Sequence, residues 1–385
     1  MAAARRAHIV GCGFAGLTAA TLLARAGWDV LALEQADAVR EIGAGLFITH
    51  NGLLVLEELG VLGSLRRRGV QLEAARYLNG EGRRLAEREL RGAERTWLFP
   101  RPALIDELHR AAIAAGARIQ TGCRVTHATP DGRLRCADGS ELAADLVVAA
   151  DGFHSTVRRE CVRARARSLG TTSIRLLIGD RSLAPEAVTE QYWHGRRRLA
   201  ITPCSPSETY VYLACPEGDP AGSGPMLACD LWSASFPALA GALRLLGRER
   251  PHIAPYVQVN CRTWQAGRIA LLGDAAHAMA PTLGQGTNLA MVNARSLVTF
   301  LGAPGAGVEQ AIARWERAVR PMTASAQRWS SFYDQLTRRW PPALGRLREP
   351  VIRRMTASSV VARRMRAACQ APPLTEARLG PEVPA

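Results

Sequence analysis

Apolar residues along the chain form short uninterrupted runs that end at glycine or aspartate. The first lies in residues 7–34, which read as a strand ("AHIVG"), a glycine-rich loop, a helix with apolar residues at helical spacing ("FAGLTAATLLARAG") and a second strand ("WDVLALE"). Two later segments, "ELAADLVVAADG" (141–152) and "RIALLGDAAHAMAP" (268–281), each read as a strand followed by the same kind of ending. The pattern predicts a βαβ unit and an α/β fold.

The middle of the chain is patterned differently. "ETYVYLAC" (208–215) alternates in the way of a half-buried strand, and "PEGDPAGSGP" (216–225) has the composition of a loop. Residues 170–260 are therefore predicted to form a sheet-containing region inserted between the other segments. Helical patterns follow from 286 to about 368, before a proline-containing tail.

The composition excludes several kinds of chemistry. All 49 basic residues are arginine, so a lysine Schiff base and a lysine-containing phosphate loop are absent. The arginines are dispersed, which is not the footprint of a nucleic-acid binder, although a formal net charge of +15 favours acidic substrates and phosphate-bearing cofactors. No apolar stretch reaches the roughly 18 residues of a membrane span, and the nine cysteines contain no C-x-x-C pair. We expect a cytoplasmic protein with reduced thiols, no metal site and no membrane or nucleic-acid partner.

The stretch "VGCGFAGLTAA" (10–20) carries the pattern G-x-G-x-x-G. Gly11 permits a tight turn, Gly13 lets the backbone approach a diphosphate, and Gly16 lets the helix pack closely on the strand. The free N–H groups and the dipole of that helix favour phosphate. Glu34, at the end of the second strand, is placed to accept hydrogen bonds from a ribose diol, which indicates FAD or NAD rather than NADP. A tight strand-to-helix turn without a ligand is the alternative.

Two further segments distinguish between these two cofactors. "DLVVAADGFHSTVR" (145–158) and "GRIALLGDAAHAMAPTLGQGTNLAM" (267–291) resemble the other fingerprints of the single-component FAD-dependent aromatic hydroxylases, the group of para-hydroxybenzoate hydroxylase. The resemblance covers roughly residues 5–330. It implies FAD as cofactor, NADH or NADPH docking transiently, and O2 as the source of an oxygen atom that a flavin C4a-hydroperoxide transfers to an aromatic ring.

Other functions remain open at this point. A flavin halogenase is disfavoured because its family uses a lysine near the flavin, and this chain has none. A flavin reductase or dehydrogenase that does not insert oxygen is one alternative. A non-enzymatic flavin-binding or ligand-binding module is the other.

The resemblance also implies the cofactor-binding residues. Asp274 is expected beside the ribityl chain and diphosphate of FAD, whereas Arg40 and Arg101 match arginines that hold the same side of the cofactor. Asp151 and its neighbours are expected near the flavin and the passing nicotinamide. The full set is Gly11, Gly13, Phe14, Ala15, Gly16, Glu34, Arg40, Arg101, Asp151, Gly152, Arg158, Gly273, Asp274, Pro281, Gly284, Gly286, Thr287 and Asn288.

The segment "PTLGQGTNLAMVNARSL" (281–297) has a physical interpretation of its own. A Pro/Gly-rich loop feeds a helix whose first residues lie near Gly286, Thr287 and Asn288. Unpaired N–H groups there are placed to face the N1–C2=O edge of a flavin and to stabilise the negative charge that reduction deposits on it. An ordinary helix start is the alternative.

Several stretches, among them "GAGLFITHNGLLVLEELGVL" (43–62) and "WERAVRPMT" (315–323), resemble the methylhydroxypyridine carboxylate oxygenase branch more closely. By that resemblance Arg198 and Tyr210 contact the acid group and ring hydroxyl of the substrate, and Arg175 matches a further active-site arginine. The implied substrate is an aromatic or heteroaromatic acid, such as a 3-hydroxypyridine carboxylate or a phenolic acid. Hydroxylation and ring opening stay open, and Arg198 and Tyr210 have the alternatives of surface and core positions.

The chain departs from that branch in the expected pocket. Phe47 stands where a tyrosine is expected, and the next pocket tyrosine falls at Arg76 or Tyr77. His50 either lines the pocket or caps the following helix. His277 is expected to support the flavin loop rather than to act as a base.

Together these patterns predict a Rossmann-like FAD-binding domain with an inserted β-sheet substrate domain and C-terminal helices, in a monomer or a homodimer. The predicted division is residues 1–67, 101–169 and 262–330 for the FAD-binding domain, residues 68–100 and 170–261 for the substrate-binding domain, and residues 331–385 for the C-terminal helices and tail.

Overall fold

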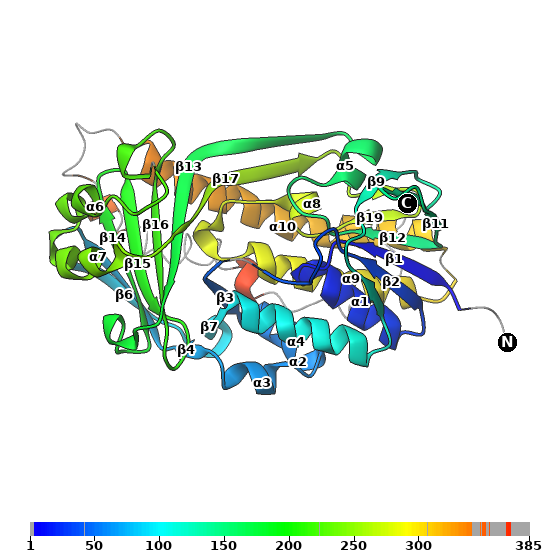
Figure 1. Ribbon diagram of the computed structural model, residues 1–385, viewed down its shortest axis with the longest axis horizontal. Coiled ribbons are helices and arrows are strands. Elements are labelled where there is room, and N and C mark those ends of the chain that lie inside the picture. The colour runs from blue at the N-terminus through cyan, green and yellow to red at the C-terminus, as the bar shows by residue number, and fades with distance from the viewer. Residues whose placement is uncertain are drawn as a thin grey trace.

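The computed structural model describes residues 4–340 apart from 42, 223 and 306, and beyond them residues 347, 349–351, 354 and 367–370. Two large sheets stand next to each other along the long axis of the molecule (Figure 1). The predicted α/β fold is confirmed. Most of the predicted C-terminal region, 331–385, lies outside the described residues, and the domain boundaries stay a prediction.

The first sheet is formed around the βαβ unit. Its strand order is β18-β19-β12-β1-β2-β8, and every pair is parallel except β18–β19. β1, β12 and β19 are almost entirely buried, which explains their unbroken apolar runs. The bounds are β1 (Arg6–Val10), β2 (Asp29–Leu33), β8 (Arg118–Gln120), β12 (Leu146–Ala149), β18 (Gln265–Ala266) and β19 (Ile269–Leu271).

Three helices cover this sheet: α1 (Phe14–Arg25), α4 (Arg101–Ala114) and α9 (Gly286–Gly302). The predicted strand at 141–152 is two strands, because residues 144 and 145 separate β12 from a short strand of another sheet. That small antiparallel sheet consists of β9 (Val125–Ala128), β10 (Arg133–Cys136) and β11 (Glu141–Ala143), with α5 (Thr156–Cys161) packed against β9.

The second large sheet has the order β17-β13-β16-β15-β14-β5-β6 and is antiparallel except between β14 and β5. Side chains on one face, among them Leu199 and Leu213, pack against Trp232 and Phe236 of a pair of short helices. The other face turns toward the first sheet. The bounds are β5 (Ala74–Asn79), β6 (Arg84–Glu89), β13 (Ala164–Ile178), β14 (Val188–His194), β15 (Arg197–Pro203), β16 (Thr209–Pro216), β17 (His252–Cys261), α6 (Cys229–Ser235) and α7 (Ala240–Leu246).

β13 and β17 form a long two-stranded ribbon that reaches from the first sheet into the second (Figure 1). The register of this ribbon shifts between Ser168 and Thr172, where residues 169–171 face Tyr256 alone on the partner strand. Gly170 has a φ of +78° inside this shift. A glycine suits such a backbone because it lacks the Cβ that makes positive φ costly.

The remaining elements connect the two sheets. A three-stranded sheet of order β3-β7-β4 lies beside the second sheet, and the long helix α10 contacts β13 of the second sheet and β18 of the first (Figure 1). In the described ranges, no helix is long and apolar enough to cross a membrane. The bounds are β3 (Gly45–Thr49), β4 (Val70–Leu72), β7 (Thr96–Pro100), α2 (His50–Glu58), α3 (Leu62–Arg66), α8 (Asp274–His277), α10 (Val308–Arg338) and the short 3-10 helices η1 (Gly92–Glu94), η2 (Arg181–Leu183), η3 (Pro220–Gly222), η4 (Pro237–Leu239) and η5 (Pro281–Leu283).

Candidate functional site

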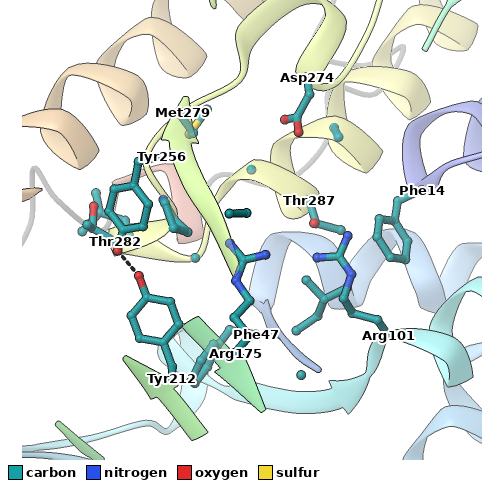
Figure 2. Close-up of a pocket in the computed structure, with 18 of the residues that line it drawn as sticks. Phe14, Phe47, Arg101, Arg175, Tyr212, Tyr256, Asp274, Met279, Thr282 and Thr287 are labelled. Atoms are coloured by element: carbon teal, nitrogen blue, oxygen red, sulfur yellow. Dashed lines mark hydrogen bonds between the residues drawn. The ribbon is translucent and has the colours of Figure 1, made fainter. Parts of the chain in front are cut away.

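A cavity of about 1140 Å³ lies between the two large sheets (Figure 2). Its walls come from the carboxyl ends of β1, β2, β12 and β19, from the first turns of α1 and α9, and from the open face of the second sheet. Pockets for a single small ligand are usually roughly 300–1,000 Å³. The space therefore suits a large ligand together with a smaller one.

The glycine-rich loop forms one end of the cavity. Gly11 has a φ of +95°, and a Cβ on it would lie 2.5 Å from the carbonyl oxygen of Ala150. A Cβ on Gly16 would lie 2.0 Å from the carbonyl oxygen of Gly11. Gly13 is different, because a Cβ there meets nothing within 4 Å and the residue lines the cavity. The loop is therefore closed on the protein side and open where a ligand would approach.

The N-terminus of α1 points into the same space. Gly13 is its N-cap, and the first turn contains no acidic residue. The first intrahelical bond runs from the N–H of Leu17 to the carbonyl of Gly13, so the N–H groups of the residues between them have no partner within the helix. Phe14 and Ala15 also line the cavity. This end of the helix is suited to an anion such as a diphosphate.

Glu34 follows β2 at the edge of the cavity and is fixed by two backbone groups. Its carboxylate accepts hydrogen bonds from the N–H of Cys12 at 2.9 Å and the N–H of Ala36 at 3.0 Å. A carboxylate has further lone pairs, so it remains able to accept hydrogen bonds from hydroxyl groups of a ligand. The ribose contact of Glu34 stays a prediction, and this position at the edge of the cavity leaves it possible.

Asp151 follows β12 and leaves one oxygen without a partner. Its Oδ2 accepts hydrogen bonds from the N–H of Thr156 at 2.8 Å and of Val157 at 3.3 Å. Its Oδ1 is buried and has no hydrogen-bond partner in the described part of the chain. Burial raises the pKa of this carboxyl group. Asp151 and Gly152 both line the cavity, so the orphaned oxygen is available to a bound polar group.

Asp274 begins α8 immediately after Gly273, and both residues line the cavity. The Asp274 side chain is open to the cavity but surrounded by protein, so desolvation raises its pKa while the charge of Arg101 works in the opposite direction. Arg101 lies across the cavity from Asp274 (Figure 2). Its guanidinium pairs with Glu41 at 2.7 Å and lies 5.2 Å from the ring centre of Phe14.

The first turn of α9 completes this end. Gly286 and Thr287 line the cavity, as do Pro281 and Gly284 of the preceding loop, and a Cβ on Gly286 would meet nothing within 4 Å. Thr287 faces the space between Arg101 and Asp274 in Figure 2. Four features of this end of the cavity suit the binding of FAD. They are the open glycine loop, the free N-terminus of α1, the unpartnered carboxylate oxygen of Asp151 and the start of α9.

Four predicted cofactor residues do not line this cavity, and one of them, Gly16, packs against Gly11 instead. Arg40 is exposed to solvent. Arg158 is buried, and its guanidinium donates to the carbonyls of Ala275 at 3.0 Å and Phe153 at 2.6 Å. The Asn288 side chain points away, bonding the backbone of Phe47 at 2.9 Å. Arg158 and Asn288 therefore hold together the loops that carry cavity residues.

The open face of the second sheet forms the other end of the cavity. Arg175, Arg198 and Tyr210 all line it. Arg175 points into the cavity (Figure 2), and its guanidinium has no hydrogen-bond or ion-pair partner in the described ranges. Burial raises the pKa of the Tyr210 hydroxyl, although the charge of Arg175 opposes the shift. Tyr210 is therefore a neutral hydrogen-bond donor at physiological pH.

Arg198 belongs to the "RRR" run but is only 9% exposed. Neighbouring residues of a strand point to opposite faces, which brings Arg198 to the cavity while Arg197 pairs with Asp219 on the other face. Three aromatic rings surround its guanidinium: Trp193 at 5.4 Å, Tyr333 at 5.5 Å and Tyr212 at 6.0 Å. Such cation–π contacts fix the position of a charge without neutralising it.

Two tyrosines at this end were not predicted. The hydroxyl groups of Tyr212 and Tyr256 are hydrogen-bonded to each other (Figure 2), and burial raises the pKa of Tyr212. Tyr212 lies two residues after Tyr210 on β16, so both side chains point to the same face of the sheet. The alternation in "YVY" could therefore have predicted Tyr212 as a cavity residue. Tyr256 lies on β17, which pairs with the far side of β13, and no local pattern indicates it.

Two of the four predicted pocket residues line the cavity and two do not. Phe47 and Tyr77 line the cavity, and the Phe47 ring centre lies 6.4 Å from that of Tyr210. Arg76 instead points to the opposite face of β5, where it pairs with Glu186 at 2.7 Å. His50 is the first residue of α2, accepts a hydrogen bond from Arg95 at 3.1 Å and does not line the cavity. Thr49, not His50, is the N-cap of that helix.

His277, the last residue of α8, is buried between α9 and Trp264. It is 2% exposed, its Nε2 lies 3.1 Å from the Nδ2 of Asn293, and its ring centre lies 5.1 Å from that of Trp264. Burial lowers the pKa of His277 from its ordinary value of 6.5 to about 4. The imidazole is therefore neutral in the folded protein at physiological pH.

This pKa gives an expected pH dependence of stability. Between about pH 6.5 and pH 4 the unfolded chain binds a proton on His277 that the folded chain does not, so this histidine makes the free energy of unfolding fall as the pH falls. His277→Gln should remove up to about 3 kcal/mol of that fall. Denaturant unfolding of both proteins across this pH window measures the difference. His109→Gln on α4 is the control, and a pH dependence unchanged in His277→Gln would contradict the expectation.

The sheet order, the glycine loop and the two-ended cavity define a flavoprotein of the monooxygenase fold. Residues 5–330 match the family described as FAD binding domain. The chain therefore belongs to this family, and it is an FAD-dependent aromatic monooxygenase. The predicted relationship to the aromatic hydroxylases and the predicted FAD cofactor are confirmed, and the family uses NAD(P)H and O2.

The individual relatives differ in what their names describe. The chain is 35% identical to a probable 2-heptyl-3-hydroxy-4(1H)-quinolone synthase of Rhodococcus erythropolis, over 93% of this chain and 94% of that protein. It is 32% identical to a 3-amino-4-hydroxybenzoate 2-monooxygenase of Streptomyces platensis, over 84% of this chain and 86% of that protein. Among solved structures, the tetrameric form of 2-methyl-3-hydroxypyridine-5-carboxylic acid oxygenase matches with a TM-score of 0.84 and 31% identity, covering 96% of this chain and 97% of that chain.

Proposed function

We propose that this protein inserts one oxygen atom from O2 into an aromatic or heteroaromatic ring that carries an ionisable hydroxyl or acid group. The observation that carries the proposal is Arg175, an unpaired guanidinium in the described structure that points into the cavity beside buried tyrosines. An anionic substrate group would complete this arrangement, because a guanidinium offers paired donors in a fixed plane. The names of the relatives are consistent with such chemistry, since one names a hydroxyquinolone as the product and the other names a hydroxybenzoate as the substrate.

Each end of the cavity has a distinct task. The glycine loop, Glu34, Asp151, Asp274 and the start of α9 would hold FAD, which would supply the oxygen-activating chemistry. The N–H groups at the start of α9 would stabilise negative charge on the adjoining edge of the cofactor.

The second sheet would hold the ring. Arg175 and Arg198 attract its anionic group, and the neutral Tyr210 hydroxyl donates a hydrogen bond to a ring oxygen. Phe47 and the aromatic rings around Arg198 shield the reacting carbon from water. A ring made electron-rich by its hydroxyl and fixed in this way is prepared for oxygen insertion.

The experiment uses the purified holoenzyme with heavy-isotope O2, NADH or NADPH, and a panel of 4-quinolones, 3-hydroxypyridine carboxylates and aminohydroxybenzoates. Mass spectrometry should find one labelled oxygen atom in the product of at least one panel member, with coenzyme consumption stimulated by that compound. Product mass also separates hydroxylation from ring opening. Coenzyme oxidation without label in any product would instead support a flavin reductase or dehydrogenase.

A further inference from the structure

The cavity extends across the second sheet well beyond the tyrosines that would hold a ring. One line of paired residues runs over six neighbouring strands, and all of its members line the cavity. They are Arg175, Tyr212, Ala200, Gln191, Tyr77 and Ala86. Adjacent strands lie about 4.8 Å apart, so Tyr77 is roughly 14 Å from Tyr212 and Ala86 is roughly 19 Å from it. A single ring held at Arg175 and Tyr210 leaves most of this length unfilled.

The part of the cavity beyond Gln191, which we call the β5–β6 arm, has apolar walls. Ala75, Tyr77, Leu85, Ala86 and Leu90 line it. Leu85 reaches the arm because the register of β5 and β6 shifts between Tyr77 and Leu78, which leaves Leu85 as an extra residue beside Ala86. Aliphatic and aromatic side chains therefore form the walls of the arm, and alanines occupy the sheet positions beneath it.

Phe47 joins this arm to the ring end. It packs in one apolar cluster with Tyr210 and Leu98, and in another with Ala75 and Leu90. The substitution that removes the expected pocket tyrosine thus removes a polar group from the junction. Phe47 therefore provides an apolar wall between the ring end and the arm.

The charged groups at the far end of the arm are paired with one another. Glu87 and Glu94 line the cavity there; Glu87 pairs with Arg84 at 2.7 Å and with Arg76 at 3.2 Å, and Arg88 lies 3.7 Å from Glu94. Guanidinium groups that are already paired with carboxylates are poor partners for phosphate, so the diphosphate of a nicotinamide coenzyme is a poor occupant. An uncharged apolar group that ends near the exposed edge strand β6 is a good one.

We propose that the β5–β6 arm binds an unbranched alkyl substituent carried by the aromatic substrate. This inference rests on the proposed function for the position of the ring. Each methylene that moves from water into the arm should tighten binding about fourfold. The substrate class is therefore a hydroxylated heteroaromatic ring with an aliphatic tail of several carbons.

The test measures binding of 2-alkyl-4(1H)-quinolones, from methyl to heptyl, to the oxidised holoenzyme by the change in its flavin absorbance spectrum. In the unaltered protein the Kd should fall about fourfold per methylene. Ala75→Phe fills the arm near its entrance and should abolish this dependence. Ala86→Phe lies at the far end and should preserve it for short chains and stop it for long ones. Glu89→Phe, on the same strand but outside the cavity lining, is the matched control and should behave as the unaltered protein.

Ala75 is 2% exposed, so its variant carries a risk to folding that the half-buried Ala86 does not. The flavin content and Tm of every variant are therefore measured first. A Kd independent of chain length in the unaltered protein overturns the proposal, as does a full chain-length dependence that survives in both cavity variants. Failure of every quinolone to bind, while a short aromatic acid is oxygenated, also overturns the arm and leaves the proposed function intact. Chain-length-dependent binding without oxygen insertion would support the arm and overturn the proposed function.

Discussion

Gly13→Val is expected to yield a folded protein that does not hold FAD. The backbone at Gly13 has φ of −77° and ψ of −171°, an extended conformation that any residue adopts, and a Cβ there meets nothing within 4 Å. The side chain would instead occupy the space at the N-terminus of α1 where the diphosphate of the cofactor must lie. We expect FAD affinity to fall by at least about 100-fold, equivalent to about 2.8 kcal/mol. Visible flavin absorbance of the purified protein and titration of the apoprotein with FAD measure the loss.

Gly63→Val provides the matched control. Gly63 lies in α3, is exposed, and also has nothing within 4 Å of an added Cβ, but it is far from the cavity lining. This variant should bind FAD as the unaltered protein does. A folded Gly13→Val protein that purified with a full complement of flavin would contradict the placement of the diphosphate at this loop.

Arg175→Met is expected to abolish most activity toward anionic substrates while leaving flavin binding unchanged. Arg175 has no partner in the described structure, so its removal breaks no contact that holds the fold. The loss of two charge-assisted hydrogen bonds, each contributing roughly 1.5–3 kcal/mol, should lower kcat/KM by at least about 100-fold. Steady-state kinetics with the substrate identified in the isotope experiment provide the measurement.

Two further variants separate charge from geometry. Arg175→Lys keeps the charge but loses the planar pair of donors, so it should recover only part of the activity. Arg165→Met removes an exposed arginine at the other end of the same strand and should have no effect. Unchanged kcat/KM in Arg175→Met would place the anionic group elsewhere, with Arg198 the remaining candidate at this end.

The parts of the site that local sequence patterns specify were predictable. The glycine loop, Glu34 and the acidic strand ends are each a short segment whose spacing fixes its geometry, and the structure brings Asp151 and Asp274 to one cavity with that loop. The βαβ unit follows from the periodicity of residues 7–34, because the strands and the helix are consecutive.

Features that depend on pairing between distant strands were not predictable. β14 pairs with β5, more than a hundred residues earlier, and that register decides that Tyr77 and not Arg76 faces the cavity. A shift of one residue would exchange the two faces, and a single sequence does not fix it. Arg198 shows the same limit, since the run of three arginines hides which of them turns inward.

The β13–β17 ribbon determines how the two ends of the cavity can move relative to each other. Any change in the angle between the large sheets must bend this ribbon, and bending is easiest at its register shift, where three residues including Gly170 face Tyr256 alone. Because the hydroxyl of Tyr256 is bonded to that of Tyr212, flexing there would stretch or relax the bond. The tyrosine pair thus ties the register shift of this ribbon to β16, the strand that also carries Tyr210.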